Sequence, residues 1–319
     1  MMGCDTVRVF VDGQEGTTGL KINERLAARD DIEVMKIAEP FRKDKNARRK
    51  FLNGADVAFL CLPDDAAAEA VAMISNPDTI VIDTSTINRI RDGWVYGLPE
   101  LSDGQAADIA ESKCIANPGC HATGFITLVY PLVKNKVVDA GCPLTCGSIT
   151  GYSGGGKKMI GEFEIAMANG PVPPMPYSLD LGHKHLHEMR KICGLKEPPI
   201  FVPVVGAFLR GMCATVPLPM DYVIGPGSWN AKKIHEMLAD YYRGKRFVKV
   251  MPFGGEGFLH KGRLDPQQCN DTNNLRIFVF GNDKRALLAA VFDNLGKGAS
   301  GAAIQNMNIA LKLDEARGL

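Results

Sequence analysis

The sequence has no strong excess of charge of either sign. Among its 319 residues, 37 are lysine or arginine and 36 are aspartate or glutamate, which gives a net charge of +1 at pH 7. It also lacks a long basic block, which proteins that bind nucleic acid or anionic membranes through charge display. The composition therefore argues against both as main partners and favours a small-molecule ligand.

Long apolar runs and a leader-like pattern are also missing. No stretch reaches the roughly 18 apolar residues that a membrane span requires. The opening Met1-Met2-Gly-Cys-Asp-Thr leads directly into a predicted strand. We therefore expect a cytoplasmic protein without a membrane partner.

The nine cysteines are odd in number, scattered, and never arranged as a CxxC pair. This pattern argues against a disulfide framework and a structural zinc site, so no metal is expected. With 45% hydrophobic and 23% charged residues, the chain is typical of a globular protein and is long enough for two domains.

A glycine pattern follows the first predicted strand, Val7–Asp12. Gly13, Gly16 and Gly19 have the spacing GxxGxxG and precede a helical stretch, Leu20–Ala28. Glycines let such a turn approach a pyrophosphate, whose charge then meets the N–H groups of the helix start. An ordinary strand-to-helix turn is the alternative that remains open.

Strands alternate with helices through the rest of the first half, which predicts a parallel, doubly wound sheet. The predicted strands are Ile32–Lys36, Asp56–Leu62 and Thr79–Asp83, and the predicted helices are Lys45–Leu52 and Asp64–Ser75. The turns after the strands, Leu62–Asp64 and Asp83–Thr86, are candidates to line a cofactor, although Asp64 and Asp83 could equally cap helices.

The residues after the second strand bear on the choice of cofactor. Glu39 lies about 20 residues after the glycines, where an acid suits the ribose hydroxyl of NAD. The basic pair Arg42 and Lys43 instead suits the 2′-phosphate of NADP. The residues alone leave this choice open.

A single thiol occupies a strand-to-helix turn in the stretch Asn117–Gly124. Pro118 and Gly119 predict a sharp turn, and an apolar helix begins just after Cys120. The positive field of a helix N-terminus lowers the pKa of a thiol and favours the reactive thiolate. A buried turn cysteine is the plainer interpretation.

A second glycine-rich turn, Gly151–Lys158, follows the predicted strand Leu144–Thr150. It resembles a phosphate-binding P-loop, but such a loop needs serine or threonine after the first lysine, where this chain has Lys158. We therefore expect either close approach of backbone to a substrate or nicotinamide, or a flexible turn.

Three of the six histidines, His183, His185 and His187, lie within five residues after the proline-rich loop Gly170–Pro176. On a helix, His183 and His187 would share a face, but the cluster lacks the carboxylate or cysteine spacing of a metal site. A surface cluster and a general acid-base for the thiol chemistry remain as hypotheses.

The remainder is rich in strands with few crossover helices, which predicts an α+β domain with a mixed or antiparallel sheet. Arg210 could bind a phosphate or carboxylate, or be a solvated strand-end arginine. A final helical run to Leu313 shows one apolar face, and we expect it to return to the first domain. The predicted strands are Ile200–Val205, Met212–Leu218, Asp221–Ile224, Phe247–Val250, Leu275–Phe280 and Leu287–Phe292, with a helix at Asn230–Tyr242; the apolar face consists of Ala302, Ile304, Met307 and Leu311.

Taken together, these features resemble the phosphorylating semialdehyde dehydrogenases, and in particular the type 2 N-acetyl-gamma-glutamyl-phosphate reductase family. The family usually reads Gly-Cys-Tyr-Pro-Thr where this chain has Gly119–Thr123, which makes His121 a candidate extra proton carrier, and it has proline where this chain has His187. The segments that carry the resemblance, in order, are Val9–Gly19, Tyr96–Glu100, Asn117–Cys120, Ser153–Lys157, His183–His185 and Asp293–Asn306.

The resemblance implies NADPH-dependent reduction of N-acetyl-glutamyl phosphate to the semialdehyde in arginine biosynthesis, with release of phosphate. It implies a Rossmann-type domain, 1–118 completed by 299–319, and a catalytic and dimerisation domain, 119–298, in a homodimer or homotetramer. Cys120 would form a thioester and His183 would move the proton, although the sequence does not separate its role from that of His185. Substrate-binding roles are implied for His185, Arg210, Ser153 and Lys157, and cofactor-binding roles for Gly13, Gly16, Thr17, Thr18, Gly19, Arg42, Thr84, Ser85 and Asn306.

Two alternatives remain. One is an enzyme like aspartate-semialdehyde dehydrogenase, which acts on a shorter aldehyde. The other is a catalytically inactive cofactor-binding or redox-sensing module, in which Cys120 would oxidise without turnover.

Overall fold

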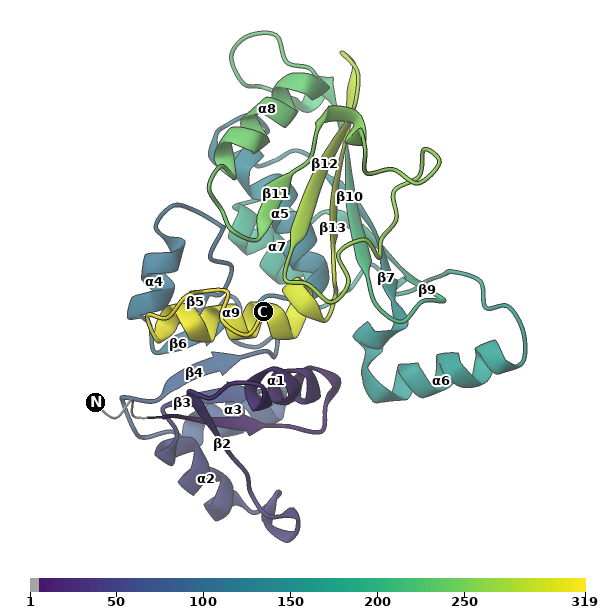
Figure 1. The fold of residues 1–319 in the computed structure, drawn as a ribbon. Helices are drawn as coiled ribbons and strands as arrows, with labels where there is room; N and C mark the ends of the chain where they lie inside the picture. The colour runs from purple at the N-terminus through teal and green to yellow at the C-terminus, as the bar shows by residue number, and fades with distance from the viewer. Residues whose placement is uncertain (1–5) are drawn as a thin grey trace. The chain divides into compact units, whose positions relative to one another are not determined.

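A computed structural model of the chain describes residues 6–319. The predicted lead-in of Met1 to Asp5 lies outside the described residues. The chain forms two compact units, of which one runs to Pro118 and resumes at Ala299–Leu319, and the other is Gly119–Gly298 (Figure 1). Within residues 6–319, no helix combines the length and apolar character needed to cross a bilayer.

The first unit contains a six-stranded sheet in the order β2-β1-β3-β4-β6-β5, and every neighbouring pair is parallel. This confirms the predicted doubly wound parallel sheet. The two-residue β5 and the short α4 were not predicted, because neither is long enough to show a hydrophobic period. The strands are β1 (Val7–Asp12), β2 (Ile32–Met35), β3 (Val57–Leu60), β4 (Ile80–Asp83), β5 (Val95–Tyr96) and β6 (Cys114–Ala116), and the helices are α1 (Thr17–Ala27), α2 (Lys45–Gly54), α3 (Asp64–Met73), α4 (Gln105–Glu111) and α9 (Gly301–Ala310), with a 3-10 turn, η1 (Glu39–Phe41).

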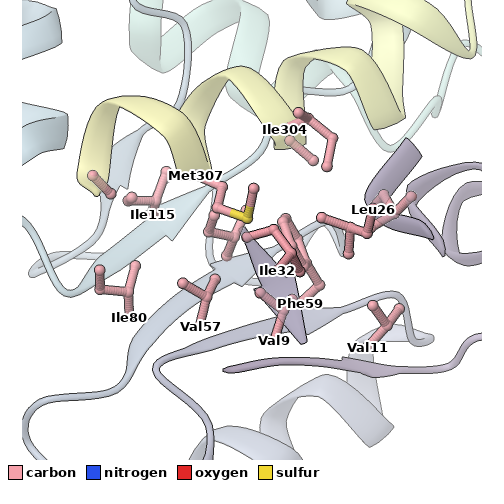
Figure 2. Close-up of a cluster of buried hydrophobic side chains, with 14 of the residues drawn as sticks. Val9, Val11, Leu26, Ile32, Val57, Phe59, Ile80, Ile115, Ile304 and Met307 are labelled. Carbon is pink, nitrogen blue, oxygen red and sulfur yellow. The ribbon is translucent and has the colours of Figure 1, made fainter. Parts of the chain in front are cut away.

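The C-terminal helix α9 packs into the core of this unit. Figure 2 shows its Ile304 and Met307 against side chains of the parallel strands, such as Val57 and Phe59. The predicted single apolar face is wrong, because residues 301–308 are all buried. The polar ones hydrogen-bond inside: Asn308 binds Arg29 at 2.6 Å.

The second unit contains a seven-stranded mixed sheet in the order β11-β12-β13-β10-β7-β9-β8. Strands β7 and β9 are parallel, as are β11 and β12, and the other pairs are antiparallel, which confirms the predicted mixed sheet. The strands are β7 (Thr145–Gly151), β8 (Met175–Pro176), β9 (Ile200–Gly206), β10 (Met212–Pro219), β11 (Val248–Val250), β12 (Leu275–Gly281) and β13 (Arg285–Phe292), and the helices are α5 (Cys120–Lys134), α6 (Gly156–Ala168), α7 (Leu186–Cys193) and α8 (Ala231–Tyr241).

One predicted strand of this unit is wrong. Residues 221–224 are not a strand, since a 3-10 turn, η3 (Met220–Tyr222), follows directly after Pro219. The glycine-rich turn leads into the helix α6 through Gly156, at φ 74°. That helix places Phe163 against Tyr152, with stacked ring centroids 5.0 Å apart.

Helix α5 lies against the sheet and is buried along almost its whole length (Figure 1). Gly124 brings it close to the strands: a Cβ at this position would lie 2.6 Å from Cβ of Ala214 on β10 and 3.1 Å from the ring of Phe292 on β13. The apolar run after Cys120 therefore forms a core helix, and its first residue is fixed by the packing of the others.

This close approach gives a stability prediction with an internal control. Gly124→Ala should lower the free energy of unfolding by about 1–3 kcal/mol, because the added methyl group overpacks the interface between helix and sheet. Gly161→Ala, inside α6 with nothing within 4 Å of the added carbon, should raise it by up to about 1 kcal/mol. Urea denaturation of both variants measures the difference, and equal effects would contradict the close packing.

Candidate active site

Cys120 is the first residue of α5. The preceding residue, Gly119, has extended backbone (φ −76°, ψ 144°), so the chain turns sharply into the helix. The sulfur therefore lies at the positive end of a buried 15-residue helix, where a thiolate is stabilised.

The other cysteines of this unit contrast with Cys120. Burial raises the pKa of the Cys146 and Cys213 thiols to about 12 and that of Cys269 to about 11. Burial also raises the pKa of Cys193. Cys142 is also partly buried, and burial with the charge of Asp139 raises its pKa. Cys120 is partly buried and begins a helix, so it is the best candidate nucleophile among these six.

Two contacts shape the backbone around the thiol. The N–H of Gly119 donates to a carboxylate oxygen of Glu188 on α7 at 3.2 Å. A Cβ at Gly298 would lie 2.9 Å from the Cβ of Cys120. The space beside the thiol therefore depends on a glycine that sequence analysis did not single out, although it lies in the segment Asp293–Asn306.

Two of the three clustered histidines lie beside the start of α5. The ring centroids of His183 and His185 are 4.6 Å apart, and both rings lie within 6 Å of His121, at 5.4 and 5.7 Å. His187 is exposed on α7, so the predicted face shared by His183 and His187 does not form: His183 precedes the helix.

The backbone N–H of His185 donates to Nδ1 of His183 at 3.1 Å. Because Nδ1 accepts this bond, the neutral ring of His183 carries its proton on Nε2. Among residues 6–319, no group of three histidine, cysteine or carboxylate side chains could hold a metal ion. The cluster therefore suits proton chemistry beside a thiol.

His121, directly after the candidate nucleophile, is almost completely buried. Its Nδ1 lies 2.8 Å from the hydroxyl of Ser148, and its Nε2 lies 2.7 Å from the hydroxyl of Tyr177. Burial and the nearby charge of His183 lower the pKa of His121 to about 3. The ring is therefore neutral near pH 7, which argues against the predicted extra proton carrier.

Tyr177 is a site residue that sequence analysis missed. Burial and the charge of Cys120 raise the pKa of its phenol, so the hydroxyl stays protonated near the thiol. It lies just after the proline-rich loop, and no periodicity or motif in that stretch distinguishes it. Only the return of this segment to α5 reveals its place.

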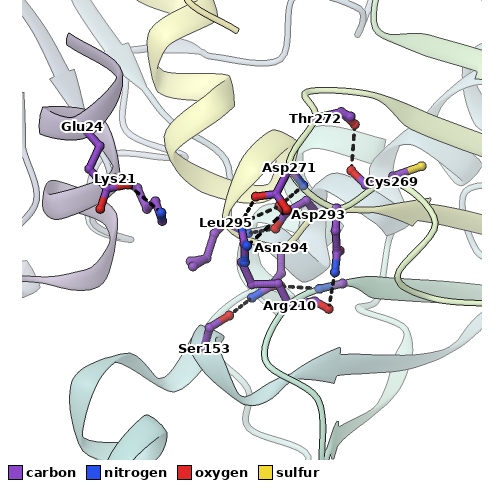
Figure 3. Close-up of polar contacts among 12 residues, drawn as sticks. Lys21, Glu24, Ser153, Arg210, Cys269, Asp271, Thr272, Asp293, Asn294 and Leu295 are labelled. Atoms are coloured by element: carbon purple, nitrogen blue, oxygen red, sulfur yellow. Dashed lines mark hydrogen bonds and ion pairs between the residues drawn. The ribbon is translucent and has the colours of Figure 1, made fainter. Parts of the chain in front are cut away.

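Ser153 and Arg210 belong to a second polar cluster in the same unit, shown in Figure 3. The amide of Asn294 links them: it donates to the hydroxyl of Ser153 at 3.0 Å and accepts from the N–H of Gly211 at 2.9 Å. The guanidinium of Arg210 binds the carboxylate of Asp271, so a substrate anion would compete with that pair.

One turn, residues 293–298, links this polar cluster to Gly298, which lies beside Cys120. The carbonyl of Asp293, whose carboxylate lies 3.7 Å from Arg210, accepts from the N–H of Gly298 at 3.0 Å. Lys157 lies in the first turn of α6 and is exposed.

The first unit contains the glycine turn at the start of α1. Gly13 has φ 87°, and a Cβ there would lie 2.2 Å from the carbonyl oxygen of Cys61. A Cβ at Gly19 would lie 2.5 Å from the oxygen of Gly13, whereas at Gly16 the nearest atom is 3.5 Å away. The fold therefore demands Gly13 and Gly19, whereas a side chain at Gly16 would make only ordinary contacts.

The first turn of α1 fits an anion. Thr17 and Thr18 begin the helix, so their N–H groups belong to its positive end. The hydroxyl oxygen of Thr17 is buried and has no hydrogen-bond partner among the described residues. A buried hydroxyl that lacks a partner among the described residues, beside the N–H groups of a helix start, fits a bound pyrophosphate.

A pocket of about 560 Å³ adjoins this turn, and Arg42 lies at its wall. The guanidinium of Arg42 pairs with Glu15 at 2.8 Å and with Glu39. Arg48 is buried and is held by Asp12 at 2.9 Å, so it is not a second ligand group for a phosphate. The lining residues are Phe10, Val11, Asp12, Gly13, Gln14, Glu15, Ile37, Glu39, Pro40, Arg42, Lys43, Arg48, Leu62 and Ala66.

The turn after β4 is held by its own side chains. The hydroxyl of Ser85 donates to Asp83 at 2.6 Å, and that of Thr84 donates to the carbonyl of Leu60 at 3.0 Å. Asp64 accepts from the N–H of Thr86 at 2.8 Å, so it joins two turns of the sheet edge.

Asn306 lies on α9, in the core of the first unit. Its amide donates to the carbonyl of Gly97 at 2.9 Å and to the side chain of Asn117 at 3.1 Å. Its buried side-chain oxygen has no partner among the described residues. Asn306 therefore orders two loops and retains one acceptor that a ligand could use.

Two family models match the chain. The NAD binding domain of semialdehyde dehydrogenases matches residues 7–109, and their dimerisation domain matches residues 120–294. The glycine turn falls in the first match, and Cys120 with the three histidines falls in the second.

Curated relatives match over nearly the whole length. The chain is 47% identical to N-acetyl-gamma-glutamyl-phosphate reductase 2 of Nostoc sp., over 98% of this chain and 99% of that protein. It is also 47% identical to N-acetyl-gamma-glutamyl-phosphate reductase of Chelativorans sp., over 96% of this chain and 98% of that protein.

Solved structures share the fold at low identity. Aspartate semialdehyde dehydrogenase II of Vibrio cholerae, complexed with ASA, matches with a TM-score of 0.70 and 16% identity over 96% of this chain and 98% of that one. The Candida albicans aspartate semialdehyde dehydrogenase with NADP matches with a TM-score of 0.62 and 14% identity, with the same coverage.

The contrast between glycines predicts separate effects on folding and binding. Gly16→Ala should change the free energy of unfolding by less than about 1 kcal/mol, because its backbone is extended and the space is open. It should nevertheless weaken binding of a nicotinamide dinucleotide, measured by fluorescence titration. Gly13→Ala should destabilise the fold by about 1–3 kcal/mol or more, because of strain at positive φ and a backbone clash. Unchanged affinity in Gly16→Ala would contradict the ligand explanation.

The neutral His121 predicts a pH dependence of stability. Its folded-state pKa of about 3 lies below the ordinary 6.5, so the unfolded chain binds more protons between these values. The stability that it contributes is complete above pH 6.5 and is lost as the pH falls towards 3. Thermal unfolding of the native chain should therefore weaken more steeply across this window than that of His121→Asn. Parallel curves would show that the ring protonates freely.

Proposed function

Because the chain belongs to the N-acetyl-gamma-glutamyl-phosphate reductase family of semialdehyde dehydrogenases, we propose that it reduces N-acetyl-L-glutamyl 5-phosphate to N-acetyl-L-glutamate 5-semialdehyde and releases phosphate. This is a step of arginine biosynthesis. The observation that carries the proposal is the thiol of Cys120 at the start of a buried helix, beside His183 and His185.

Cys120 begins the reaction as the nucleophile. Its thiolate attacks the acyl carbon, a C–S bond forms, and the bond from that carbon to the phosphate oxygen breaks. Phosphate leaves and a thioester remains on Cys120. The helix start favours the thiolate before attack, and Gly298 lets the chain pass close to Cys120, since a Cβ there would lie 2.9 Å from the Cβ of Cys120.

Reduction of the thioester requires a hydride and a proton. NADPH, when bound, supplies the hydride. His183 holds the proton on Nε2 and donates a hydrogen bond to the oxygen that becomes negative at the former carbonyl. His183 gives this proton to that oxygen once the hydride has arrived, and takes it back as the C–S bond breaks. The aldehyde forms, Cys120 leaves as thiolate, and the proton is again on Nε2. His185, fixed against His183, helps to bind the substrate.

The substrate carries a carboxylate and a phosphate, which call for cations. We assign Arg210 and Lys157, with the hydroxyl of Ser153, to these groups. The pair of Arg210 with Asp271 is partly exposed, so a substrate anion can replace the carboxylate.

NADPH is proposed as the cofactor over NADH. Arg42 lies at the wall of the pocket beside the glycine turn, where the 2′-phosphate of NADP would take the place of Glu15 or Glu39. Gly13, Gly16 and Gly19, with Thr17 and Thr18, would hold the pyrophosphate. Thr84 and Ser85, on the turn after β4, and Asn306, on α9, would complete the site.

A homodimer or homotetramer is proposed for the assembly. The second unit matches a dimerisation domain, and the outward side chains of β9 are apolar and exposed: Ile200 is 56% exposed and Val202 is 41% exposed. Such a patch on a sheet face suits a second copy of the chain.

The reverse reaction tests the function directly. NADPH formation is followed with NADP, phosphate and N-acetyl-glutamate semialdehyde, and in parallel with aspartate semialdehyde. Phosphate-dependent absorbance with the acetylated aldehyde alone is expected. Cys120→Ala should lower turnover by at least about 10⁴-fold while retaining NADPH binding, because the thioester cannot form.

Other outcomes have definite meanings. Activity with aspartate semialdehyde alone would establish the other substrate class. If no NADPH forms with either aldehyde, although the protein is folded, binds NADPH and is alkylated at Cys120, the result would favour a redox-sensing module. An active Cys120→Ala variant would exclude the thioester mechanism. Cys193→Ala, which removes a buried thiol far from any solvent, is the matched control.

Cofactor choice is tested at Arg42. Arg42→Ala should raise the KM for NADPH by about 10-fold or more, because a charge-assisted bond to the 2′-phosphate is lost. The KM for NADH should change little. An equal rise for both cofactors would mean that Arg42 only shapes the pocket.

A further inference from the structure

Residues 169–185, which carry His183 and His185 to the site, have little regular structure. Their one strand is β8, of two residues, paired with β9. Within this segment, Ser178 and Leu181 adopt left-handed φ values of 53° and 58°, and Leu181 is 53% exposed. Local backbone structure therefore does little to fix the position of His183.

Tyr177 is the side chain that anchors this segment. Its backbone N–H donates to the carbonyl of Pro203 on β9 at 3.0 Å, and its hydroxyl bonds to Nε2 of His121 at 2.7 Å. The neighbouring Met175 and Leu179 are 41% and 76% exposed, so they contribute little packing. This hydrogen bond joins the segment to α5, together with the ring contacts of His183 and His185 with His121.

His121 is itself fixed from the other side. It is 2% exposed, and its Nδ1 bonds to the hydroxyl of Ser148 on β7 at 2.8 Å. A neutral imidazole has one donor and one acceptor, so one hydroxyl donates to the ring and the other accepts from it. Ser148, His121 and Tyr177 thus form a single chain of two bonds with a defined direction.

The same ring contacts the proposed acid-base residue. The rings of His121 and His183 meet edge to face at 5.4 Å, and the ring of Phe201 lies 5.1 Å from each. His183 is therefore enclosed by His121, Phe201 and Tyr177, whose ring lies 6.0 Å away. A shift of the His121 ring would change its contacts with both His183 and Phe201.

We propose that His121 is a positioning residue, which holds His183 beside the thiol of Cys120 by binding the hydroxyl of Tyr177 and bracing the ring of His183. This inference rests on the proposed function, in which His183 moves the proton. The titratable groups that face His121 are Cys120, His183, His185 and Tyr177. Glu188 on α7 lies nearby, where it accepts from the N–H of Gly119, the residue before Cys120.

Two substitutions separate the bonds of the ring. An asparagine amide reaches the position of Nδ1 and can retain the hydrogen bond to Ser148. A glutamine amide reaches the position of Nε2 and can retain the hydrogen bond to Tyr177. His121→Asn should lower kcat roughly 10- to 100-fold, because a displaced proton carrier loses its alignment. His121→Gln should retain a larger share of kcat. KM should change less in both.

A mutant cycle tests the path through Tyr177. Tyr177→Phe should lower kcat about as much as His121→Asn, and the double variant should lose little more, because both break the same bond. Ser148→Ala should cost less than either. His235→Asn, a partly buried histidine that bonds only to the carbonyl of Met251 at 2.8 Å, is the matched control.

Alkylation of Cys120 gives a readout that needs no substrate. The rate with iodoacetamide is measured against pH for the native chain, His121→Asn and His121→Gln, each shown to be folded by circular dichroism. A change in the pH profile for His121→Asn, and a smaller one for His121→Gln, supports the inference even if no aldehyde is turned over, so failure of the proposed function is seen separately. Equal profiles in all three proteins, or additive losses in the mutant cycle, would overturn it.

Discussion

The close packing of α5 on its sheet is the constraint on which the candidate active site depends. Gly124 removes the side chain that would hold the helix away from Ala214 and Phe292, and nearly all of the remaining helix is buried. A helix enclosed in this way cannot slide or rotate without opening the core. Cys120 therefore occupies a fixed position without any side-chain cap, and the positive end of the helix is directed at its sulfur.

Burial acts in opposite directions on neighbouring groups of this unit. It raises the pKa of the inner thiols such as Cys146 and so makes them inert, and it lowers the pKa of His121 and so keeps that ring neutral. A neutral ring does not add charge beside Cys120, so the positive end of the helix is left to favour the thiolate. The site thus contains a buried histidine, His121, with a structural role, beside a partly exposed histidine, His183, that is available for chemistry.

The sequence predicts those features that come from local patterns. Alternating strands and helices gave the parallel sheet, and the apolar run after Cys120 gave the helix start, because periodicity and turn residues are local signals. The role of Tyr177 could not be found this way, since its partner His121 is 56 residues away and no spacing rule joins them. The same holds for Gly298, which meets Cys120 only in the folded unit. The mistaken strand at 221–224 shows the converse: β-branched and apolar residues favour a strand, but β10 ends at Pro219 and a 3-10 turn follows it.

The glycines show how far a structure alone can indicate a ligand. Gly13 and Gly19 are required by the protein itself, since any side chain would strike backbone oxygens. Gly16 has ordinary backbone angles and open space, so neither strain nor packing accounts for it. A residue that is small for no internal reason, at the start of a helix and beside the orphaned hydroxyl of Thr17, is best explained by a molecule that approaches the backbone there. The ligand is thus inferred from Gly16, the one glycine of the three at which the fold would accept a side chain, and not from the GxxGxxG spacing.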